Sequence, residues 1–373
     1  MDFSLTEEQQ AVGDLARQIL EGQVTQERLK ELEGSEAPYD ERTWGELARA
    51  GLLGIALPEE VGGAGLGFLE VCRLLEQVGR TVAPVPVLPS VVMGALPVAR
   101  FGTDDQRHRF LPPAAAGDLV LTAALVEVGT DPARPTTEAS RDRGGWRLDG
   151  VKVCVPAGLV AGRVLVPART GEDAVGVFVL DTAAEGVAIE RQDTTSGIPE
   201  ARLELSGAVV DDRDVLGEST GGAAIVDWTV ERATAAVCAV MCGVCQEALR
   251  LTAEYTKTRE QFDRPIATFQ AVGHRAADAY VDTEAIRLTA LQAAWRISAG
   301  LPASEAVAVA KFWAAEGGQR VVHAAQHLHG GIGVDRDYPL HRYFLWAKHL
   351  ELTLGGATPQ LVRLGAMLAA EPV

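Results

Sequence analysis

Residues 255–270 read Tyr255-Thr256-Lys257-Thr258-Arg259-Glu260-Gln261-Phe262-Asp263-Arg264-Pro265-Ile266-Ala267-Thr268-Phe269-Gln270. This mainly polar run joins two long Ala-rich segments, 227–255 and 268–299, whose apolar residues recur with helical spacing. Two further segments of the same kind cover residues 304–326 and 340–354. Four long helices with short connections predict an antiparallel bundle.

The residues before this bundle have two different textures. Residues 118–217 contain short alternating apolar runs separated by Gly, Pro and Asp, and the pair Asp149-Gly150 predicts a hairpin turn. Earlier residues have a helical pattern that includes a candidate capping box, Thr6-Glu7-Glu8-Gln9, and helical segments at 37–51 and 69–78. The predicted fold class is therefore α+β, with an N-terminal helical domain (residues 1–117), a middle antiparallel β domain (118–218) and a C-terminal four-helix bundle (219–373).

The charge balance argues against two classes of partner. The 373 residues include 51 Asp and Glu against 34 Lys and Arg, a net charge of −17. Binding to nucleic acid or to an anionic membrane needs clustered basic residues, so we expect neither partner. The most apolar stretch, residues 82–98, contains four prolines. It is also shorter than the ~20 uninterrupted apolar residues of a spanning helix.

The N-terminus and the cysteine count indicate the compartment. The first residues have neither the basic region nor the apolar region of a secretion signal. Five cysteines are an odd number, which fits a reducing cytosol better than a disulfide framework. We expect a cytoplasmic protein.

Two clusters can be interpreted either as binding sites or as ordinary structure. Residues 62–67 resemble a phosphate-binding loop, but no strand precedes them and no Lys-Ser/Thr pair follows, which favours a turn between helices. Cys238, Cys242 and Cys245 share one helix face. Because no fourth ligand lies nearby, buried packing is favoured over a zinc site.

Three histidines near the C-terminus present the same choice. His323 and His327 are four residues apart, and His329 follows. No acidic residue on that face completes a ligand set, so a metal site is the weaker alternative. No paired carboxylates and no Ser/His/Asp arrangement can be recognised from the spacing.

The run at 255–270 resembles the acyl-CoA dehydrogenase motif Tyr-x-x-x-Arg-x-x-Phe-Gly-x-Pro-Ile-x-x-Phe-Gln, with Asp263 in place of the glycine. Residues 329–333, 338–339 and 347–348 are similar to the family's Gly-Gly-x-Gly…Tyr-Pro…Ala-Lys segment at matching spacing. Residues 57–65 resemble its Pro-Glu-Glu-x-Gly-Gly loop, and residues 101–112 resemble its Gly-Thr/Ser-x-x-Gln…Leu-Pro segment. The resemblance covers the whole chain and implies the same helix–β–helix architecture.

The resemblance also implies a chemistry. Members of the family bind FAD and an acyl-CoA thioester. A glutamate removes the α-proton while the β-hydride moves to flavin N5, and an electron-transfer flavoprotein is the expected acceptor. Because the α-proton is a weak acid, the base must lie within hydrogen-bond reach and the thioester oxygen must be polarised.

The catalytic glutamate of the family is missing from its usual place. Ungapped counting from the Gly-Gly motif puts the family's Glu-Gly-Thr at residues 354–356, so the glutamate position is Leu354. An alternative location of the base, on the first bundle helix, corresponds to Ala233 and Val240. Glu231 and Glu351 lie near these positions, but a carboxylate on another helix face cannot reach the α-carbon.

The middle segment lacks the family's flavin contacts. The family's Trp-Ile-Thr/Ser follows a Gly-x-Lys turn; here the tryptophan position is Cys154 and the threonine position is Pro156. The family's Thr-Glu-Pro becomes Val126-Glu127-Val128. The resemblance places all these losses on the half-site for the chain's own flavin.

The residues that reach a neighbouring subunit's FAD in the family are retained. They are Arg259, Phe262, Gly330 and Gly331, with Gln270 at the end of the first motif and His327 in place of a usual Gln. A guanidinium such as that of Arg259 can pair with pyrophosphate oxygens.

The chain thus keeps the residues that would contact a partner's FAD and lacks the residues that would bind its own FAD and act as the base. It resembles the non-catalytic subunit of actinobacterial α2β2 steroid side-chain acyl-CoA dehydrogenases, which implies a second acyl-CoA dehydrogenase-like subunit and a steroid-derived or other bulky acyl-CoA. Two alternatives stay open. One is a self-sufficient homomer with Glu231 or Glu351 as a displaced base, and the other is a non-enzymatic paralogue that binds acyl-CoA.

Overall fold

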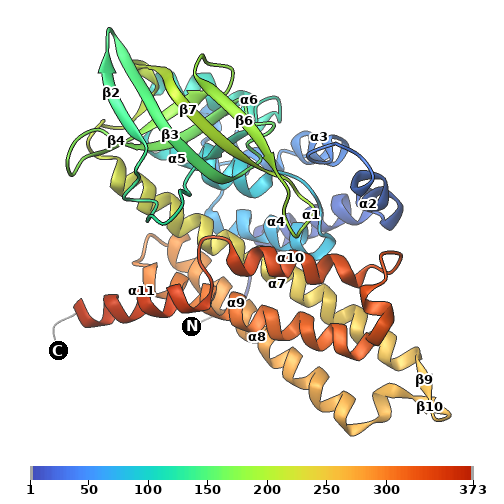
Figure 1. Cartoon of the computed structure of the whole chain (residues 1–373). Helices are drawn as coiled ribbons and strands as arrows, with labels where there is room; N and C mark the ends of the chain where they lie inside the picture. Colours follow the sequence, from blue (N-terminus) through green and yellow to red (C-terminus); the bar gives the residue numbers. More distant parts are fainter. Residues whose placement is uncertain (1–2, 371–373) are drawn as a thin grey trace.

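A computed structural model describes residues 3–370 as helices, then a β-sheet, then helices (Figure 1), which confirms the α+β class. The N-terminal elements are α1 (Glu7–Gln23), α2 (Gln26–Glu33), α3 (Glu41–Arg49), η1 (Leu52–Gly54), η2 (Glu59–Val61), α4 (Phe68–Thr81), the π-helical η3 (Leu88–Ala95), α5 (Leu96–Phe101) and α6 (Asp104–Ala115). The strands of the large sheet are β1 (Leu121–Ala123), β2 (Glu138–Asp142), β3 (Gly145–Pro156), β4 (Arg163–Arg169), β5 (Val175–Asp181), β6 (Val187–Gln192), β7 (Glu200–Asp211) and β8 (Val215–Leu216), with the short turn η4 (Asp212–Asp214) before β8. The C-terminal elements are α7 (Gly222–Thr258), β9 (Glu260–Gln261), β10 (Arg264–Pro265), η5 (Ile266–Thr268), α8 (Gln270–Ser298), α9 (Ser304–His329), η6 (Gly330–Val334), α10 (Leu340–Leu352) and α11 (Ala357–Ala370).

The first helix begins at the predicted capping box. The Gln9 N–H donates to the Thr6 hydroxyl at 3.2 Å, and the Thr6 N–H donates to the Gln9 side-chain oxygen at 3.1 Å. This reciprocal pair satisfies backbone donors that a helix start otherwise leaves unpaired. The Gln9 amide also donates to Glu70 at 3.0 Å, which ties α1 to α4.

Helix α4 crosses α7 at two glycines, one on each helix. A Cβ on Gly79 would lie 1.9 Å from the carbonyl oxygen of Val240, and a Cβ on Gly243 would lie 1.9 Å from that of Glu76. Only glycine lets two helix backbones approach this closely. The crossing therefore sets the position of the N-terminal helices against the C-terminal bundle.

The sheet runs in the order β6-β7-β3-β2-β4-β5-β8, with β1 beside β4. Most neighbouring strands are antiparallel, as predicted, but β1 and β2 each pair with β4 in parallel. The buried residues of β4 and β5 are nearly continuous, which is typical of strands covered on both faces.

The hairpin predicted at Asp149-Gly150 is wrong, because β3 continues through these residues. The turn instead lies at Arg143 and Gly144, which join β2 to β3. Just before Gly150 the pairing of β3 with β7 shifts register, and a Cβ on Gly150 would lie 2.5 Å from the Thr137 hydroxyl oxygen. The Asp-Gly signal marks an irregularity in the strand where only glycine fits.

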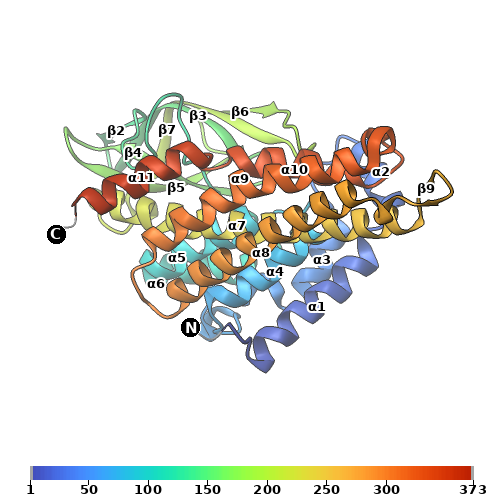
Figure 2. The same cartoon turned by 90° about the horizontal axis from the view of Figure 1, so that it is seen from below.

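The four predicted C-terminal helices are present as α7, α8, α9 and α10 (Figure 2). A further helix, α11, was not predicted, because the last helical pattern recognised in the sequence ends at residue 354. Helix α7 is long and apolar enough to cross a membrane, with a mean hydropathy of 1.3 over its best window, but 72% of that window is buried inside the protein. Within the described chain, α7 is thus the core helix of the bundle.

Candidate FAD-contact surface and the expected position of the base

The β9–β10 hairpin carries the first predicted FAD contacts. It follows directly after α7, where the Arg259 N–H donates to the Tyr255 carbonyl oxygen at 2.8 Å, and it projects from one end of the bundle (Figure 1). Its turn residues are Phe262 and Asp263, with φ of 54° and 58°. Two successive left-handed residues are typical of a type I′ turn, and aspartate enters this region more readily than most residues. Asp263 can therefore occupy the position of the motif's glycine.

The side chains of this hairpin make few contacts with the rest of the chain. Phe262 is 87% exposed, and its ring meets only the edge of Phe269, with centroids 6.1 Å apart. Within residues 3–370 the guanidinium of Arg259 has neither a hydrogen bond nor an ion pair, while that of Arg264 lies 4.2 Å from the centre of the Phe269 ring. Gln270 is exposed at the start of α8 and approaches the His274 ring at 3.5 Å. An exposed aromatic ring beside an unpaired arginine is typical of a contact surface.

The second predicted segment is the turn after α9. Gly330 has φ of 64°, and no atom lies within 4 Å of a Cβ placed on Gly330 or on Gly331. Both glycines are exposed, as is His327 on the last turn of α9. The backbone of this turn is therefore open to a molecule from outside the chain.

These two segments lie at the same end of the bundle (Figures 1 and 2). Tyr255, one turn before Arg259, stacks on His329, which directly precedes Gly330; the ring centroids are 4.4 Å apart and the planes differ by 20°. The structure thus brings together Arg259 and the Gly330-Gly331 turn, which are about seventy residues apart in sequence.

The expected position of the catalytic base holds no carboxylate. Leu354 lies in the turn between α10 and α11 with φ of 55°, and it packs against the hydrophobic core. Its carbonyl oxygen accepts a hydrogen bond from the Gln360 amide at 3.1 Å. An aliphatic side chain cannot accept the α-proton.

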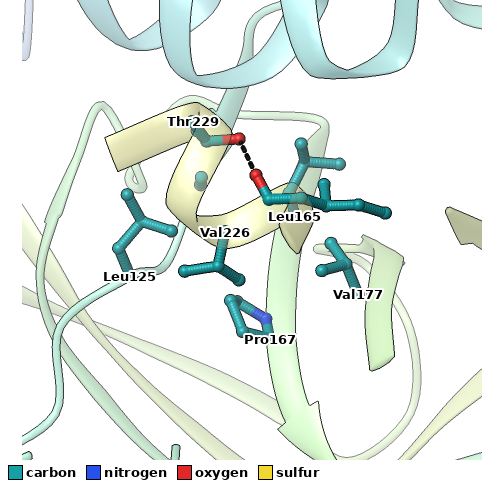
Figure 3. Close-up of a pocket in the computed structure, with 8 residues that line it drawn as sticks. Leu125, Leu165, Pro167, Val177, Val226 and Thr229 are labelled. Atoms are coloured by element: carbon teal, nitrogen blue, oxygen red, sulfur yellow. Dashed lines mark hydrogen bonds between the residues drawn. The ribbon is translucent and has the colours of Figure 1, made fainter. Parts of the chain in front are cut away.

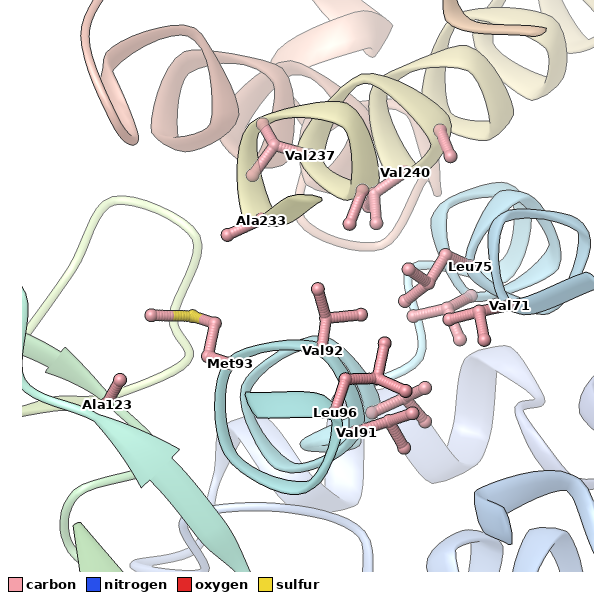
Figure 4. Packing of buried hydrophobic residues seen from close by; sticks show 14 of the residues in the cluster. Val71, Leu75, Val91, Val92, Met93, Leu96, Ala123, Ala233, Val237 and Val240 are labelled. Carbon is pink, nitrogen blue, oxygen red and sulfur yellow. The ribbon is translucent and has the colours of Figure 1, made fainter. Parts of the chain in front are cut away.

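The alternative face on α7 is apolar and filled. Ala233 and Val240 are buried, and Figure 4 shows this face directed toward Val92 on η3 and Leu75 on α4. A small cavity near the start of α7, lined by Leu125, Leu165, Pro167, Val177, Val226 and Thr229 among others, has a volume of about 10 Å³ (Figure 3). That is room for about one water molecule, and the lining is apolar apart from the Thr229 hydroxyl, which donates to the Ile225 carbonyl at 2.7 Å.

The two candidate substitute bases already have partners. Glu231 accepts a hydrogen bond from the Ser304 hydroxyl at 2.7 Å and lies 3.4 Å from the Arg232 guanidinium. Glu351 pairs with Lys348 at 2.6 Å. Each partner stabilises the carboxylate where it is, so neither group is presented as a free base.

Two residues retained in the middle segment form a buried ion pair. Glu127 accepts from the Lys152 ammonium at 2.5 Å, and the Lys152 ammonium also donates to the Pro167 carbonyl at 2.7 Å. The N–H groups of Thr136 and Thr137 donate to the same carboxylate at 2.6 and 3.1 Å. Burial raises the pKa of Glu127, but the Lys152 ammonium and the hydrogen bonds from the Thr136 and Thr137 hydroxyls outweigh it and lower the pKa to about 2. This pair is part of the folded core.

Two exposed residues close to that pair in sequence occupy positions where the resemblance predicts proline and tryptophan, namely Val128 and Cys154. Val128 is 85% exposed. Cys154 is exposed with φ of 50°, and its N–H donates to the Gln192 side chain at 2.8 Å. Partial burial and the adjacent Glu200 raise the pKa of the Cys154 thiol, and the Glu200 carboxylate lies 3.5 Å from the His349 ring on α10. The expected tryptophan position is therefore occupied by a protonated thiol beside a carboxylate and an imidazole.

The cysteine cluster and the 62–67 segment have the structural roles that the sequence favoured, buried packing and a turn between helices. Cys238, Cys242 and Cys245 are all buried in α7, and burial raises the pKa of each thiol, that of Cys238 to about 12. The 62–67 segment joins η2 to α4, as a turn between helical elements.

The three histidines do not converge. The exposed ring of His323 lies against Phe344 with centroids 4.9 Å apart, whereas His329 is buried against Tyr255. Within residues 3–370, no group of three His, Cys, Asp or Glu side chains has the geometry to hold a metal ion.

One buried group near the Leu354 turn was not found from the sequence. Lys311 of α9 is fully buried, and its ammonium donates to the carbonyls of Leu350 and Glu351 at 3.0 and 2.9 Å. Burial lowers the pKa of Lys311 to about 8. The ammonium caps the end of α10 and holds the turn that carries Leu354. A single lysine in an Ala-rich helix is no signal for such a contact.

Comparison with known proteins agrees with this architecture. Three family models match in chain order: the acyl-CoA dehydrogenase N-terminal domain over residues 6–118, the middle domain over 126–209 and the C-terminal domain over 220–366. The chain is 43% identical over 381 residues to the acyl-CoA dehydrogenase FadE27 of Mycobacterium tuberculosis, covering 100% of both proteins.

Two solved structures are also closely similar. A chain of the ChsE4-ChsE5 complex from Mycobacterium tuberculosis is 43% identical with a TM-score of 0.94, covering 100% of both chains. A chain of a variant of the Tcur3481-Tcur3483 steroid ACAD is 48% identical with a TM-score of 0.91, covering 97% of this chain and 98% of that one. The chain therefore belongs to the acyl-CoA dehydrogenase family, whose members are FAD-dependent oxidoreductases that act on CH–CH bonds.

Proposed function

We propose that this chain is the subunit of a heteromeric acyl-CoA dehydrogenase that completes the FAD site of a partner subunit, while the partner supplies the catalytic glutamate. The partner is a second acyl-CoA dehydrogenase-like chain, and the assembly is an α2β2 heterotetramer. The similarity to chains of two heteromeric complexes supports this proposal.

The observation that carries the proposal is the contrast between two surfaces of the same chain. At the end of the bundle, Arg259 and Phe262 are exposed, the Arg259 guanidinium has no hydrogen bond or ion pair within residues 3–370, and the Gly330-Gly331 turn is open. At the chain's own proposed half-site, the resemblance places Cys154 at the family's tryptophan position and Leu354 at its glutamate position. The first surface can serve another subunit, and the second cannot support the reaction alone.

The groups at the bundle end fit a flavin dinucleotide. A free guanidinium matches pyrophosphate oxygens in a bidentate manner, an exposed ring can lie against a ring of the cofactor, and a glycine turn lets a phosphate or ribose approach the backbone. FAD, when bound, accepts the β-hydride of the acyl thioester. Arg259, Phe262, Gly330 and Gly331 would bind and orient it, with Gln270 and His327 at the margin, and the α-proton would move to the partner's glutamate.

The substrate class follows from the relatives. We propose a bulky acyl-CoA, with a steroid side chain as the favoured acyl group, because one close structural relative is a steroid ACAD. An electron-transfer flavoprotein is the proposed acceptor, and the cytoplasm is the proposed compartment. The acyl chain would be held by the partner, since the corresponding face of α7 is filled by Val92 and Leu75.

The test is native mass spectrometry with a visible spectrum, on the chain alone and co-purified with its partner. We expect a flavin-poor, inactive chain alone and two flavins in each α2β2 assembly. Arg259→Gln should weaken FAD binding by the complex roughly tenfold to a hundredfold, because one charge-assisted contact is lost. Arg143→Gln, at the β2–β3 turn on the opposite side of the molecule, is the matched control and should leave the FAD affinity unchanged.

Each alternative gives a different outcome. One flavin for every chain in an active homomer would overturn the proposal and point to Glu231 or Glu351 as a displaced base. Binding of acyl-CoA with no flavin in any complex would identify a non-enzymatic paralogue.

A further inference from the structure

We propose that Tyr255, His329 and Tyr338 form an aromatic clamp that sets the relative position of the β9–β10 hairpin and the Gly330-Gly331 turn, and that FAD affinity in the complex depends on it. These three are positioning residues, since none is among the proposed FAD contacts. The inference deepens the proposed function, because it explains how two segments far apart in sequence could meet one cofactor.

The clamp joins three connections of the bundle. The Tyr255 ring on α7 stacks on His329 with centroids 4.4 Å apart, and the Tyr338 ring meets both, with centroids 6.3 Å from Tyr255 and 5.2 Å from His329. Tyr338 lies in the segment between η6 and α10. The three rings thus connect the end of α7, the end of α9 and the approach to α10.

Hydrogen bonds fix the central ring in one orientation. The His329 Nδ1 lies 2.8 Å from the carbonyl oxygen of Ala325, which can only accept, so Nδ1 carries the proton. The Nε2 then accepts from the Tyr338 hydroxyl at 3.1 Å. The imidazole is buried, and burial lowers its pKa, which keeps the ring neutral and suited to this pair of bonds. Both ring nitrogens are satisfied, so the ring cannot rotate without losing a bond.

The clamp residues are directly linked to the proposed contacts. The Arg259 N–H donates to the Tyr255 carbonyl at 2.8 Å, so the start of the hairpin follows the position of Tyr255. His329 is covalently joined to Gly330, whose φ of 64° begins the open turn. Because a displacement of about 1 Å can matter greatly at a binding site, coupling of these two elements is expected to control how well both reach one ligand.

The test uses the complex with its partner subunit and measures the dissociation constant of FAD by flavin fluorescence, together with the thermal melting of the complex. Tyr255→Leu removes the stack, and we expect FAD to bind roughly tenfold more weakly, about 1.4 kcal/mol. Tyr255→Phe keeps the ring and should restore FAD affinity to within roughly twofold of the wild type. If Tyr255 only stabilised the fold, the two variants would bind FAD with the same affinity at temperatures where the melting curves show both complexes to be folded.

A second variant covers the case in which Tyr255→Leu does not fold. Tyr338→Phe removes only the hydroxyl that bonds the imidazole, and it should weaken FAD binding roughly threefold. His323→Gln is the matched control, because His323 is on the same helix as His329, but its exposed ring contacts Phe344 and lies outside the clamp. Equal FAD affinity for Tyr255→Leu and Tyr255→Phe, or for Tyr338→Phe and His323→Gln, would overturn the clamp.

The Arg259→Gln variant separates this inference from the proposed function. If Arg259→Gln weakens FAD binding while the clamp variants do not, only the clamp fails. If Arg259→Gln has no effect on FAD binding, the proposal that this chain contributes to the partner's FAD site is wrong.

Discussion

Replacement of Glu127 by glutamine should destabilise the protein strongly, although the site is far from the proposed FAD contacts. The Glu127 carboxylate is buried and lies 2.5 Å from the Lys152 ammonium. It also accepts hydrogen bonds from Thr136 and Thr137. Glu127→Gln removes the negative charge but keeps the shape, so the buried ammonium of Lys152 loses its counter-charge.

The magnitude follows from the pKa of the carboxyl group. The fold lowers the pKa of Glu127 from 4.5 to about 2. At about 1.4 kcal/mol for each pH unit, this difference corresponds to about 3 kcal/mol of stability for the ionised form. Loss of one member of a buried ion pair typically costs about 3–5 kcal/mol, which agrees with this value.

The same linkage predicts a pH dependence with a definite sign. The pKa of Glu127 is lower in the folded protein than in the unfolded chain, so its contribution is complete above pH 4.5. The contribution is lost as the pH falls from 4.5 to about 2, because the unfolded chain then binds a proton that the folded protein excludes. The free energy of unfolding of Glu127→Gln should therefore fall less than that of the wild type when the pH is lowered below 4.5.

The assay is urea unfolding at pH 7, repeated at lower pH. Glu204→Gln is the matched control, because its side chain is 48% exposed on the same sheet and pairs with Arg202 at the surface. The control should change the free energy of unfolding by no more than about 0.5 kcal/mol. If Glu127→Gln also stays within about 1 kcal/mol of the wild type, the Glu127–Lys152 ion pair does not stabilise the folded protein to the expected extent.

Other substitutions test separate parts of the structure. Gly243→Ala places a methyl group against the backbone of α4 and should lower the free energy of unfolding by roughly 1–3 kcal/mol or more. Its control is Gly273→Ala on α8, where a Cβ meets nothing within 4 Å, and this variant should raise the free energy of unfolding by up to about 1 kcal/mol. Equal effects of the two substitutions in a denaturation experiment would contradict the close helix crossing. Leu354→Glu in the chain alone should still give no bleaching of flavin by acyl-CoA, since the flavin half-site is changed as well; turnover by this variant alone would show that only the base was missing. Glu231→Gln and Glu351→Gln should leave turnover of the complex within about twofold, whereas loss of a general base would reduce it by roughly a hundredfold or more.

The sequence predicted the elements that depend on local pattern. Helical spacing over residues 227–255 and 304–326 predicted α7 and α9, and the capping residues at Thr6 and Gln9 predicted the start of α1. These features depend on residues within a few positions of one another, where periodicity and backbone hydrogen bonding decide the structure.

The prediction from sequence was wrong where the same pair of residues suits two different backbone structures. Asp149-Gly150 is compatible with a hairpin turn and also with an irregular strand, and the contact of Gly150 with Thr137 decides for the strand. Helix α11 was missed for a related reason, because Gly355 and Gly356 interrupt the helical pattern before it starts again at Ala357.

The sequence by itself determined which of the proposed functional groups this protein has and which it lacks: Arg259, Phe262 and the glycine turn are present, and a glutamate at position 354 is absent. Only the tertiary structure decided how those groups are arranged. It stacks Tyr255 on His329 and places Glu200 beside His349, pairs that are separated by many residues of chain. Such contacts arise from the packing of helices and strands against one another, which brings together side chains that no local spacing connects.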